Sequence, residues 1–186
     1  SGILVVARTK SAASALAKSF RGRNTEKTYW AILKGVPKPR QGKISNWLAK
    51  MRNEDGDDYM SVVKHGTPDA DHSVSQYRVI EASGPNLSWV ELKPVTGRTH
   101  QLRAHMAEVG HPIIGDGKYG GSGQENLGDG WGAMLGGELS RKLHLHARSL
   151  TIEHPVSGAL LTLTAPLPPH MAETWDAMGW NAADVP

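Results

Sequence analysis

The sequence of 186 residues contains no cysteine and a single phenylalanine, Phe20. Without cysteine the chain forms no disulfide and offers no thiolate ligand to a metal. It has no run of about 20 apolar residues, which a membrane-spanning helix needs, and no charged segment followed by an apolar one, as in a secretory signal. These absences are typical of a cytoplasmic protein. With 39% hydrophobic residues, residues 1–186 are expected to form one domain around its own core.

Acidic residues are scarce in the first part of the chain. Residues 1–52 contain 12 Lys and Arg but one acid, Glu26, for a net charge of +11. Residues 53–186 contain 9 Lys and Arg against 17 acids, for a net charge of −8. This asymmetry indicates a basic face for a polyanion such as RNA, because clustered Lys and Arg release counterions from phosphates. Alternatively, the acidic half folds over the basic half and neutralises it.

Hydrophobic periodicity and turn residues predict an α+β fold. Apolar or alternating segments predict strands over residues 3–7, 28–33, 59–64, 73–82, 88–95, 143–153 and 159–164. Helices are predicted over residues 11–20, with Ser11 as N-cap, over 99–109, with an apolar stripe of Leu102, Met106 and Val109, and over 168–178. Residues 115–140 hold ten glycines and are expected to form a long loop. Because strands in hairpin order outnumber helices, we expect a central, mostly antiparallel sheet flanked by helices and loops.

The segment TGRTHQLRAHMAEVGH, from Thr96 to His111, is followed by PIIGDGKYGG and holds the densest group of polar functional side chains. Arg98 precedes a predicted helix N-terminus, where backbone amides attract anions and an arginine adds a bidentate donor. An ordinary surface helix with solvated arginines is the alternative. A metal site is disfavoured, because His100 and His105 are five residues apart and diverge by roughly 140° around a helix. We therefore expect no metal.

Extended to TGRTHQLRAHMAEVGHPIIGD, this segment resembles the third conserved motif of the RluA-type pseudouridine synthases, which isomerise uridine in RNA. SGILVVARTKSAASAL resembles the segment directly after the family's aspartate motif H-R-L-D-x-x-T-S-G, EKTYWAILKGVP its K-x-Y strand, and LHLHARSLTIEHPVSG its C-terminal strand. The resemblance extends from Ser1 to about Pro166 and is weakest over residues 41–71 and in the glycine-rich loop. It implies a pseudouridine synthase fold with a catalytic cleft, a reaction without cofactor, and RNA as partner. LHLHARSLTIEHP is most similar to RluC-like enzymes, which act on large-subunit ribosomal RNA. We expect a monomer.

The resemblance also implies roles for individual residues. Tyr29 would stack on the target uracil, since an extruded base needs an aromatic face. Arg98 would pair with the catalytic carboxylate and keep it ionised. Lys27 would contact phosphate and Leu102 would line the uracil pocket. Contacts to the RNA backbone are expected from Arg103, Lys118 and the basic residues Lys18, Arg21 and Arg23. Tyr29 could instead be a core aromatic of its strand.

The family's nucleophilic aspartate lies four residues before the serine that matches Ser1. The resemblance therefore implies a fragment without the aspartate motif, the strands upstream of it and any N-terminal RNA-binding domain, and we expect this fragment alone to be inactive. Asp116, in the I-G-D-G sequence, is expected to anchor its loop rather than to act as nucleophile. Two other functions stay open. One is an RNA-binding module without catalysis, and the other is a basic globular domain whose charge serves protein contacts.

Overall fold

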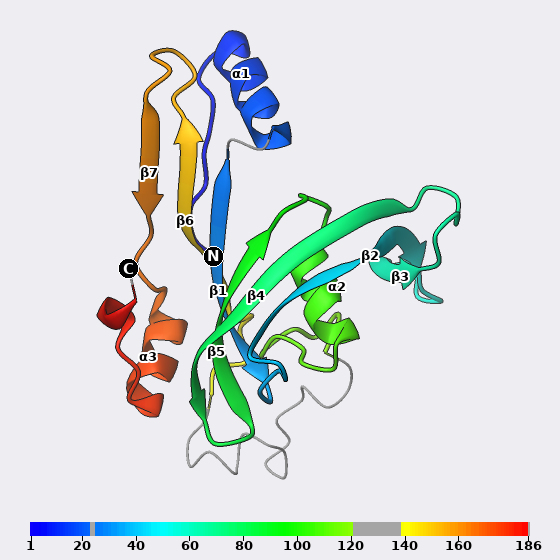
Figure 1. The fold of residues 1–186 in the computed structure, drawn as a ribbon, viewed down its shortest axis with the longest axis vertical. Coiled ribbons are helices and arrows are strands. Elements are labelled where there is room, and N and C mark those ends of the chain that lie inside the picture. The colour runs from blue at the N-terminus through cyan, green and yellow to red at the C-terminus, as the bar shows by residue number, and fades with distance from the viewer. Residues whose placement is uncertain (23–24, 121–138, 186) are drawn as a thin grey trace.

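The computed structural model describes residues 1–22, 25–120 and 139–185. These residues form a seven-stranded antiparallel sheet in the order β3-β2-β4-β5-β1-β6-β7, so the predicted α+β class is confirmed (Figure 1). Within these ranges no helix is both long and apolar enough to cross a membrane. The elements are α1 (Lys10–Arg21), β1 (Glu26–Lys34), β2 (Gln41–Arg52), β3 (Asp58–Val63), β4 (Asp71–Ser83), β5 (Leu87–Pro94), α2 (Gln101–Glu108), β6 (Leu145–Glu153), β7 (Leu160–Thr164), α3 (Pro169–Met178) and a 3-10 turn (Ala182–Asp184).

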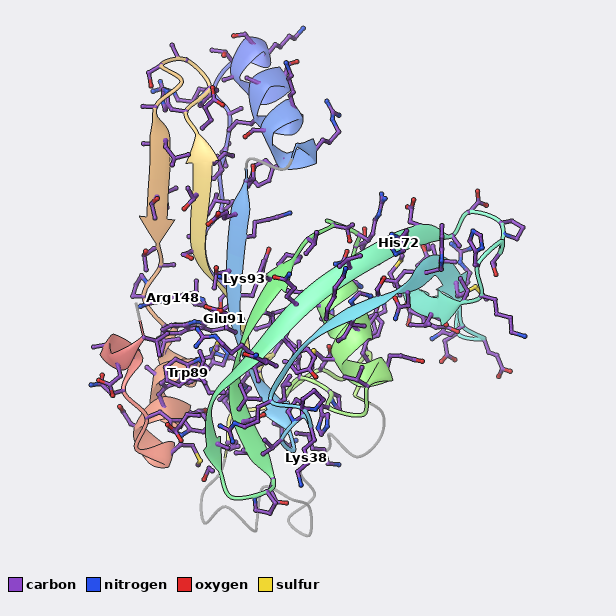
Figure 2. All side chains as sticks on the ribbon, viewed as in Figure 1. Lys38, His72, Trp89, Glu91, Lys93 and Arg148 are labelled. Carbon is purple, nitrogen blue, oxygen red and sulfur yellow. The ribbon has the colours of Figure 1, made fainter. Side chains whose placement is uncertain are left out.

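The sheet separates two apolar clusters, because side chains alternate between its faces. On one face Leu102 and Met106 of α2 pack in a cluster with Ala31 and Leu33 of β1. On the other face Trp30 and Trp89 pack with Trp175 of α3, with ring centroids of Trp30 and Trp89 4.8 Å apart in an edge-on arrangement. Trp89 lies on β5 beside α3 (Figure 2). Strands β1 and β5 are thus buried from both sides and form a firm base for side chains that project toward α2.

A third, smaller cluster joins α1, the N-terminal segment and β6. Ile3, Val5 and Ala7 pack against this cluster, but Leu4 and Val6 are 84% and 74% exposed. The prediction of a buried strand over residues 3–7 is therefore wrong. The only strand pairing near this segment in the described chain is one bridge between Gly2 and Ala147. Its side chains at positions 3, 5 and 7 pack against the cluster, and those at positions 4 and 6 face solvent.

Two further details of the prediction are wrong. Helix α1 begins before Ser11, because Thr9 is the N-cap and its hydroxyl accepts a hydrogen bond from the Ala12 amide at 3.2 Å. Val109 does not extend the buried stripe of α2, since it is 41% exposed at the point where the helix ends. Both differences lie at helix ends, where backbone geometry rather than hydrophobic spacing decides the boundary.

Strand β2 was not predicted at all, although it is 12 residues long and pairs with both β3 and β4. The other predicted strands correspond to β1 and β3 to β7, and the predicted helices to α1, α2 and α3. Strands β2, β3 and the outer half of β4 lean away from β6 and β7, with α2 beside them (Figure 1). Most of the predicted glycine-rich loop, residues 121–138, lies outside the described residues, as does Arg23.

Candidate active site

A cavity of about 400 Å³ opens between β1, the end of α1 and the start of α2. It brings together Tyr29, Arg98, Lys27, Leu102 and Arg103, five of the residues to which the family resemblance assigns a role in catalysis or RNA binding. Its lining residues are Phe20, Lys27, Tyr29, Pro94, Gly97, Arg98, His100, Gln101, Leu102, Arg103 and Leu145. Lys118, by contrast, lines a separate hollow with Asn53, Asp57, Tyr59 and Gly117.

Tyr29 supplies an aromatic ring to this cavity from the middle of the sheet. It pairs with Leu92 of β5 and Ala147 of β6, and the register with β6 shifts between Thr28 and Tyr29. The side chain also packs at the edge of the α2 cluster, so the alternative of a core aromatic describes part of its environment. Burial raises the pKa of the Tyr29 phenol, which therefore stays protonated at neutral pH. The ring is suited to stack on a base and to donate a hydrogen bond rather than to act as a base.

Lys27 lies two residues before Tyr29 and lines the same cavity. Partial burial lowers the pKa of its ammonium group. A β-carbon at Gly97 would lie 3.4 Å from the Lys27 Nζ, an ordinary van der Waals distance, so the ammonium group lies next to the loop that precedes α2. The lysine is thus held close to the loop that precedes α2, where a phosphate would meet both the ammonium group and backbone amides.

Gln101 organises that loop, and sequence reasoning missed it. Its side chain is 3% exposed, and its Nε2 donates to the Val74 carbonyl and to the Ser75 Oγ, both at 2.8 Å. Its Oε1 accepts from the Thr96 hydroxyl at 2.6 Å and from the Arg98 amide at 3.1 Å. All hydrogen-bonding groups of the amide are satisfied, which fixes the start of α2 to β4. The sequence offered one signal for this role: the polar Gln101 directly precedes Leu102, the first residue of the predicted apolar stripe.

Arg98 lines the cavity and its Nη1 lies 3.4 Å from the Asp71 Oδ2. The two side chains are 41% and 57% exposed, so solvent screens this ion pair and it contributes little to stability. The guanidinium can therefore exchange Asp71 for another anion at small cost. This behaviour fits the predicted role of pairing with a carboxylate, and equally a contact with phosphate.

Arg103 is not a solvated surface arginine, because its guanidinium is committed to Asp116. Nε and Nη2 donate to the two carboxylate oxygens at 2.8 and 2.7 Å, and the guanidinium lies 4.9 Å from the centroid of the Tyr119 ring. The hydrogen bond and charge of Asp116 raise the pKa of Arg103. Asp116 is 2% exposed and also accepts from the amides of Lys118 and Tyr119. It anchors its loop, as predicted from the sequence.

The three histidines of the motif each make different contacts. His100 Nδ1 lies 3.0 Å from the Tyr119 Oη, and His111 Nδ1 lies 3.0 Å from the Lys34 carbonyl oxygen. His105 is buried, with Ser75 Oγ 2.9 Å from its Nδ1 and Asn46 Oδ1 2.8 Å from its Nε2. Burial lowers the pKa of His105 to about 4, so it is a neutral link between α2 and the sheet. In the described residues no three His, Asp or Glu side chains are grouped as metal ligands.

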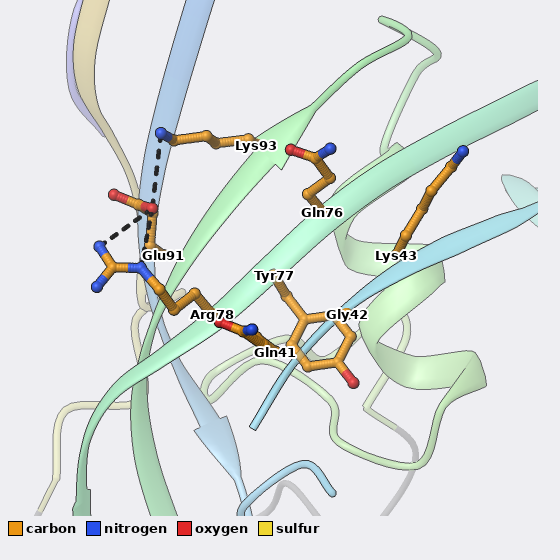
Figure 3. A pocket seen from close by; sticks show the side chains of 8 residues that line it. All are labelled: Gln41, Gly42, Lys43, Gln76, Tyr77, Arg78, Glu91 and Lys93. Carbon is orange, nitrogen blue, oxygen red and sulfur yellow. Dashed lines mark hydrogen bonds and ion pairs between the residues drawn. The ribbon is translucent and has the colours of Figure 1, made fainter. Parts of the chain in front are cut away.

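A second hollow, of about 450 Å³, lies on the face of the sheet turned away from α2 (Figure 3). Glu91 lies 3.3 Å from Arg78 and 3.7 Å from Lys93, so these cations share one carboxylate. The Tyr77 ring lies against Gly42 and its hydroxyl donates to the Pro39 carbonyl at 3.1 Å. The described lining of this hollow includes no aliphatic side chain, so it lacks the apolar wall that Leu102 and Leu145 give to the first cavity. Its lining residues are Gln41, Gly42, Lys43, Gln76, Tyr77, Arg78, Glu91 and Lys93.

No Asp or Glu lines the Tyr29 cavity in the described part of the chain. Ser1 lies beside it, however, because its amino group donates to the carbonyl of the lining residue Leu145 at 3.2 Å.

An aromatic ring, an apolar side chain and the cations of Lys27 and Arg98 around one cavity are the groups with which proteins bind a base and its phosphates. The sequence model of the family described as RNA pseudouridylate synthase matches residues 1–108. The chain belongs to this family.

The chain is also similar to individual family members. It is 36% identical over 171 residues to the dual-specificity RNA pseudouridine synthase RluA of Salmonella typhi, covering 89% of this chain and 68% of that protein. It is 34% identical over 169 residues to an uncharacterized RNA pseudouridine synthase of Synechocystis sp., covering 91% of this chain but only 47% of that protein. Among solved structures, human RNA pseudouridylate synthase domain containing 4 superimposes with a TM-score of 0.72 at 32% identity, covering 92% of this chain and 69% of that one. The chain thus spans about half to two thirds of the length of these relatives.

Proposed function

We propose that this protein converts uridine to pseudouridine in a structured RNA, and that residues 1–186 form one unit of its catalytic domain. The reaction breaks the bond between N1 of uracil and C1′ of the ribose and forms a bond from C5 to C1′. The hydrogen of C5 leaves as a proton, N1 gains a proton, and no electron is transferred to a cofactor. The observation that carries the proposal is the cavity in which Tyr29, Arg98, Lys27 and Leu102 meet.

Each side chain has a part in this proposal. Tyr29 stacks on the uracil and Leu102 forms the apolar wall beside it. Lys27 binds a phosphate next to the target nucleotide. Arg98 releases Asp71 and pairs with the nucleophilic carboxylate, which precedes Ser1. Arg103, with its guanidinium held by Asp116, shapes the wall of the cavity.

The RNA that this protein acts on is proposed to be large-subunit ribosomal RNA, and the protein is proposed to act as a cytoplasmic monomer. The C-terminal segment LHLHARSLTIEHP supports the RNA class through its resemblance to RluC-like enzymes. Lys118, in its separate hollow, and the basic residues Lys18 and Arg21 of α1 would contact RNA outside the target nucleotide.

Release of tritium from C5 of uridine in unmodified large-subunit ribosomal RNA tests the proposal. Two proteins are compared: residues 1–186, and a version extended upstream through the aspartate motif. We expect release by the extended protein and none by residues 1–186. Silence of both proteins on ribosomal RNA and on transfer RNA would contradict the proposed activity.

An RNA-binding module without catalysis is the second candidate, favoured by the absence of an acid among the described lining residues of the cavity. Under this alternative the extended protein binds RNA but releases no tritium. The third candidate is a protein whose basic face serves protein contacts. RNA affinity that rests on phosphate contacts falls steeply as the salt concentration is raised, so a steep fall in RNA affinity between low and high salt supports the two RNA-binding candidates over the third.

A further inference from the structure

His100 lines the candidate cavity in an unusual backbone conformation. It lies immediately before α2 with φ of 50° and ψ of 20°, in the left-handed region that residues other than glycine rarely adopt. It makes no capping bond to the helix through its side chain. Such strain persists only where neighbouring contacts hold it, and it is concentrated at functional sites. The His100 side chain contacts Tyr119, with the two ring centroids 5.7 Å apart.

The hydrogen bonds around Tyr119 determine which nitrogen of His100 carries the proton. The Met60 backbone amide, which can only donate, gives a hydrogen bond to the Tyr119 Oη at 2.9 Å. The phenol hydrogen is then free to be donated to His100 Nδ1, 3.0 Å away. With Nδ1 as acceptor, the neutral imidazole carries its hydrogen on Nε2.

The opposite tautomer is disfavoured. If His100 Nδ1 were the donor, the Tyr119 oxygen would accept two hydrogen bonds and its own hydrogen would have no acceptor among the described residues. Partial burial, with the positive charges of Arg103 and Lys118, lowers the pKa of His100 despite the opposing charge of Asp116. The ring is therefore neutral at pH 7, with Nε2–H as its available donor. In the described chain no protein group accepts a hydrogen bond from this nitrogen.

We propose that His100 is a substrate-contacting residue that donates from Nε2–H to an acceptor oxygen of the bound RNA, and that Tyr119 is the positioning residue that fixes this tautomer. The proposal rests on the proposed function, because it requires RNA to enter the cavity. The acceptor is a phosphate oxygen or a uracil carbonyl, both of which take a neutral donor. Unlike Lys27 and Arg98, His100 contributes direction without charge, so its contribution does not depend on salt.

The tautomer and the contact are both measured by NMR of the histidine ring nitrogens in residues 1–186. Free protein is expected to show His100 protonated on Nε2, and Tyr119→Phe is expected to shift it toward a mixture of tautomers. Addition of a short oligouridylate is expected to move the His100 Nε2 signal. His100→Asn, which tolerates the left-handed backbone but has no donor at that position, is expected to bind the oligouridylate roughly three- to tenfold more weakly.

His72→Asn is the matched control. His72 is exposed on the outer part of β4, outside the cavity, and its Nε2 lies 3.0 Å from the Ser45 Oγ (Figure 2). It is expected to leave oligouridylate binding unchanged. Two further probes distinguish the two acceptors. If an abasic ribose phosphodiester oligomer shifts the His100 signal, the acceptor is a phosphate oxygen. If free uridine shifts it, the acceptor is a uracil carbonyl.

The inference is overturned, and the proposed function stands, if oligouridylate binds but the His100 signal does not move and His100→Asn binds it as tightly as the wild type. If the wild-type chain binds no oligouridylate, both the inference and the proposed binding of RNA in the cavity are overturned. If His100→Asn does not fold, Tyr119→Phe decides, since it keeps the ring beside Arg103. An unaltered tautomer and unaltered oligouridylate affinity in that variant would also sink the proposal.

Discussion

Removal of the Asp116 carboxylate by Asp116→Ala is expected to destabilise the fold substantially. Asp116 receives two hydrogen bonds from Arg103 and one each from the Lys118 and Tyr119 amides. The side chains of the ion pair are 18% and 1% exposed, so the variant leaves a mostly buried guanidinium without its carboxylate. Breaking a buried pair in this way costs about 3–5 kcal/mol. Because Arg103 can still reach some water, we expect the lower end, about 3 kcal/mol.

For a chain of this length, that loss corresponds to a fall of about 6–12 °C in Tm. Urea unfolding followed by circular dichroism gives the free energy of unfolding, and a thermal scan gives Tm. Asp58→Ala is the control, because Asp58 pairs with Lys50 and Arg52 at the protein surface. It is expected to change stability little. If Asp116→Ala costs no more than Asp58→Ala, Arg103 and Asp116 do not anchor the loop after α2, and the account of that wall is wrong.

Three other changes test the candidate site and its supports. Tyr29→Phe keeps the stacking face but loses the hydroxyl; in the extended protein it is expected to lose most tritium release while binding RNA as before, and undiminished turnover would remove the hydroxyl from the mechanism. Gly97→Ala is expected to leave Tm and RNA affinity nearly unchanged, because its β-carbon would lie 3.4 Å from the flexible end of Lys27, an ordinary van der Waals distance; a several-fold loss of affinity in filter binding would contradict this. Lowering the pH from 7.5 to 5 is expected to destabilise the fold, because burial lowers the pKa of His105 and of His144 to about 4. Both histidines take up protons in the unfolded chain near pH 6.5, so stability is complete above that pH and falls as the pH drops toward 4, by about 2 kcal/mol for each at pH 5. Equal urea midpoints at the two pH values would contradict this assignment.

The strands that the sequence predicted well are those with an apolar pattern of their own. β1 and β5 carry Trp30, Ile32, Trp89 and Leu92, which are buried at 2% exposure or less. Strand β2, by contrast, has polar side chains at half of its positions without regular alternation, and its two neighbours β3 and β4 supply the hydrogen bonds that make it a strand. Such long-range pairing leaves no short-range pattern in the sequence.

Residues 3–7 show the opposite error. Their β-branched, apolar sequence predicts a buried strand, but the described chain covers only one side of them. The β-propensity of a segment shows that it can form a strand, but it does not show whether another strand lies beside it to pair with.

In the candidate site, too, some features were predictable from the sequence and others were not. Motif resemblance singled out Tyr29 and Arg98, and the structure brings both to one cavity. It did not reveal that Arg103 is held by Asp116, or that Gln101 ties the loop before α2 to β4. Those contacts depend on side chains brought together by the fold. A residue whose role is to hold another residue has no chemical signature of its own in the sequence.

The cavity is bounded by parts of the protein that differ in how firmly they are attached. Tyr29 and Leu102 belong to or border the large cluster under α2, whereas Phe20 is carried by α1, in which Leu16 is the only buried residue. Elements with so little buried apolar surface open locally at a free energy far below that of global unfolding. The amides of α1 should therefore exchange with solvent much faster than those of β1. If RNA binds here as proposed, the side of the cavity formed by α1 yields as a base enters, and the side that carries the Tyr29 ring keeps its shape.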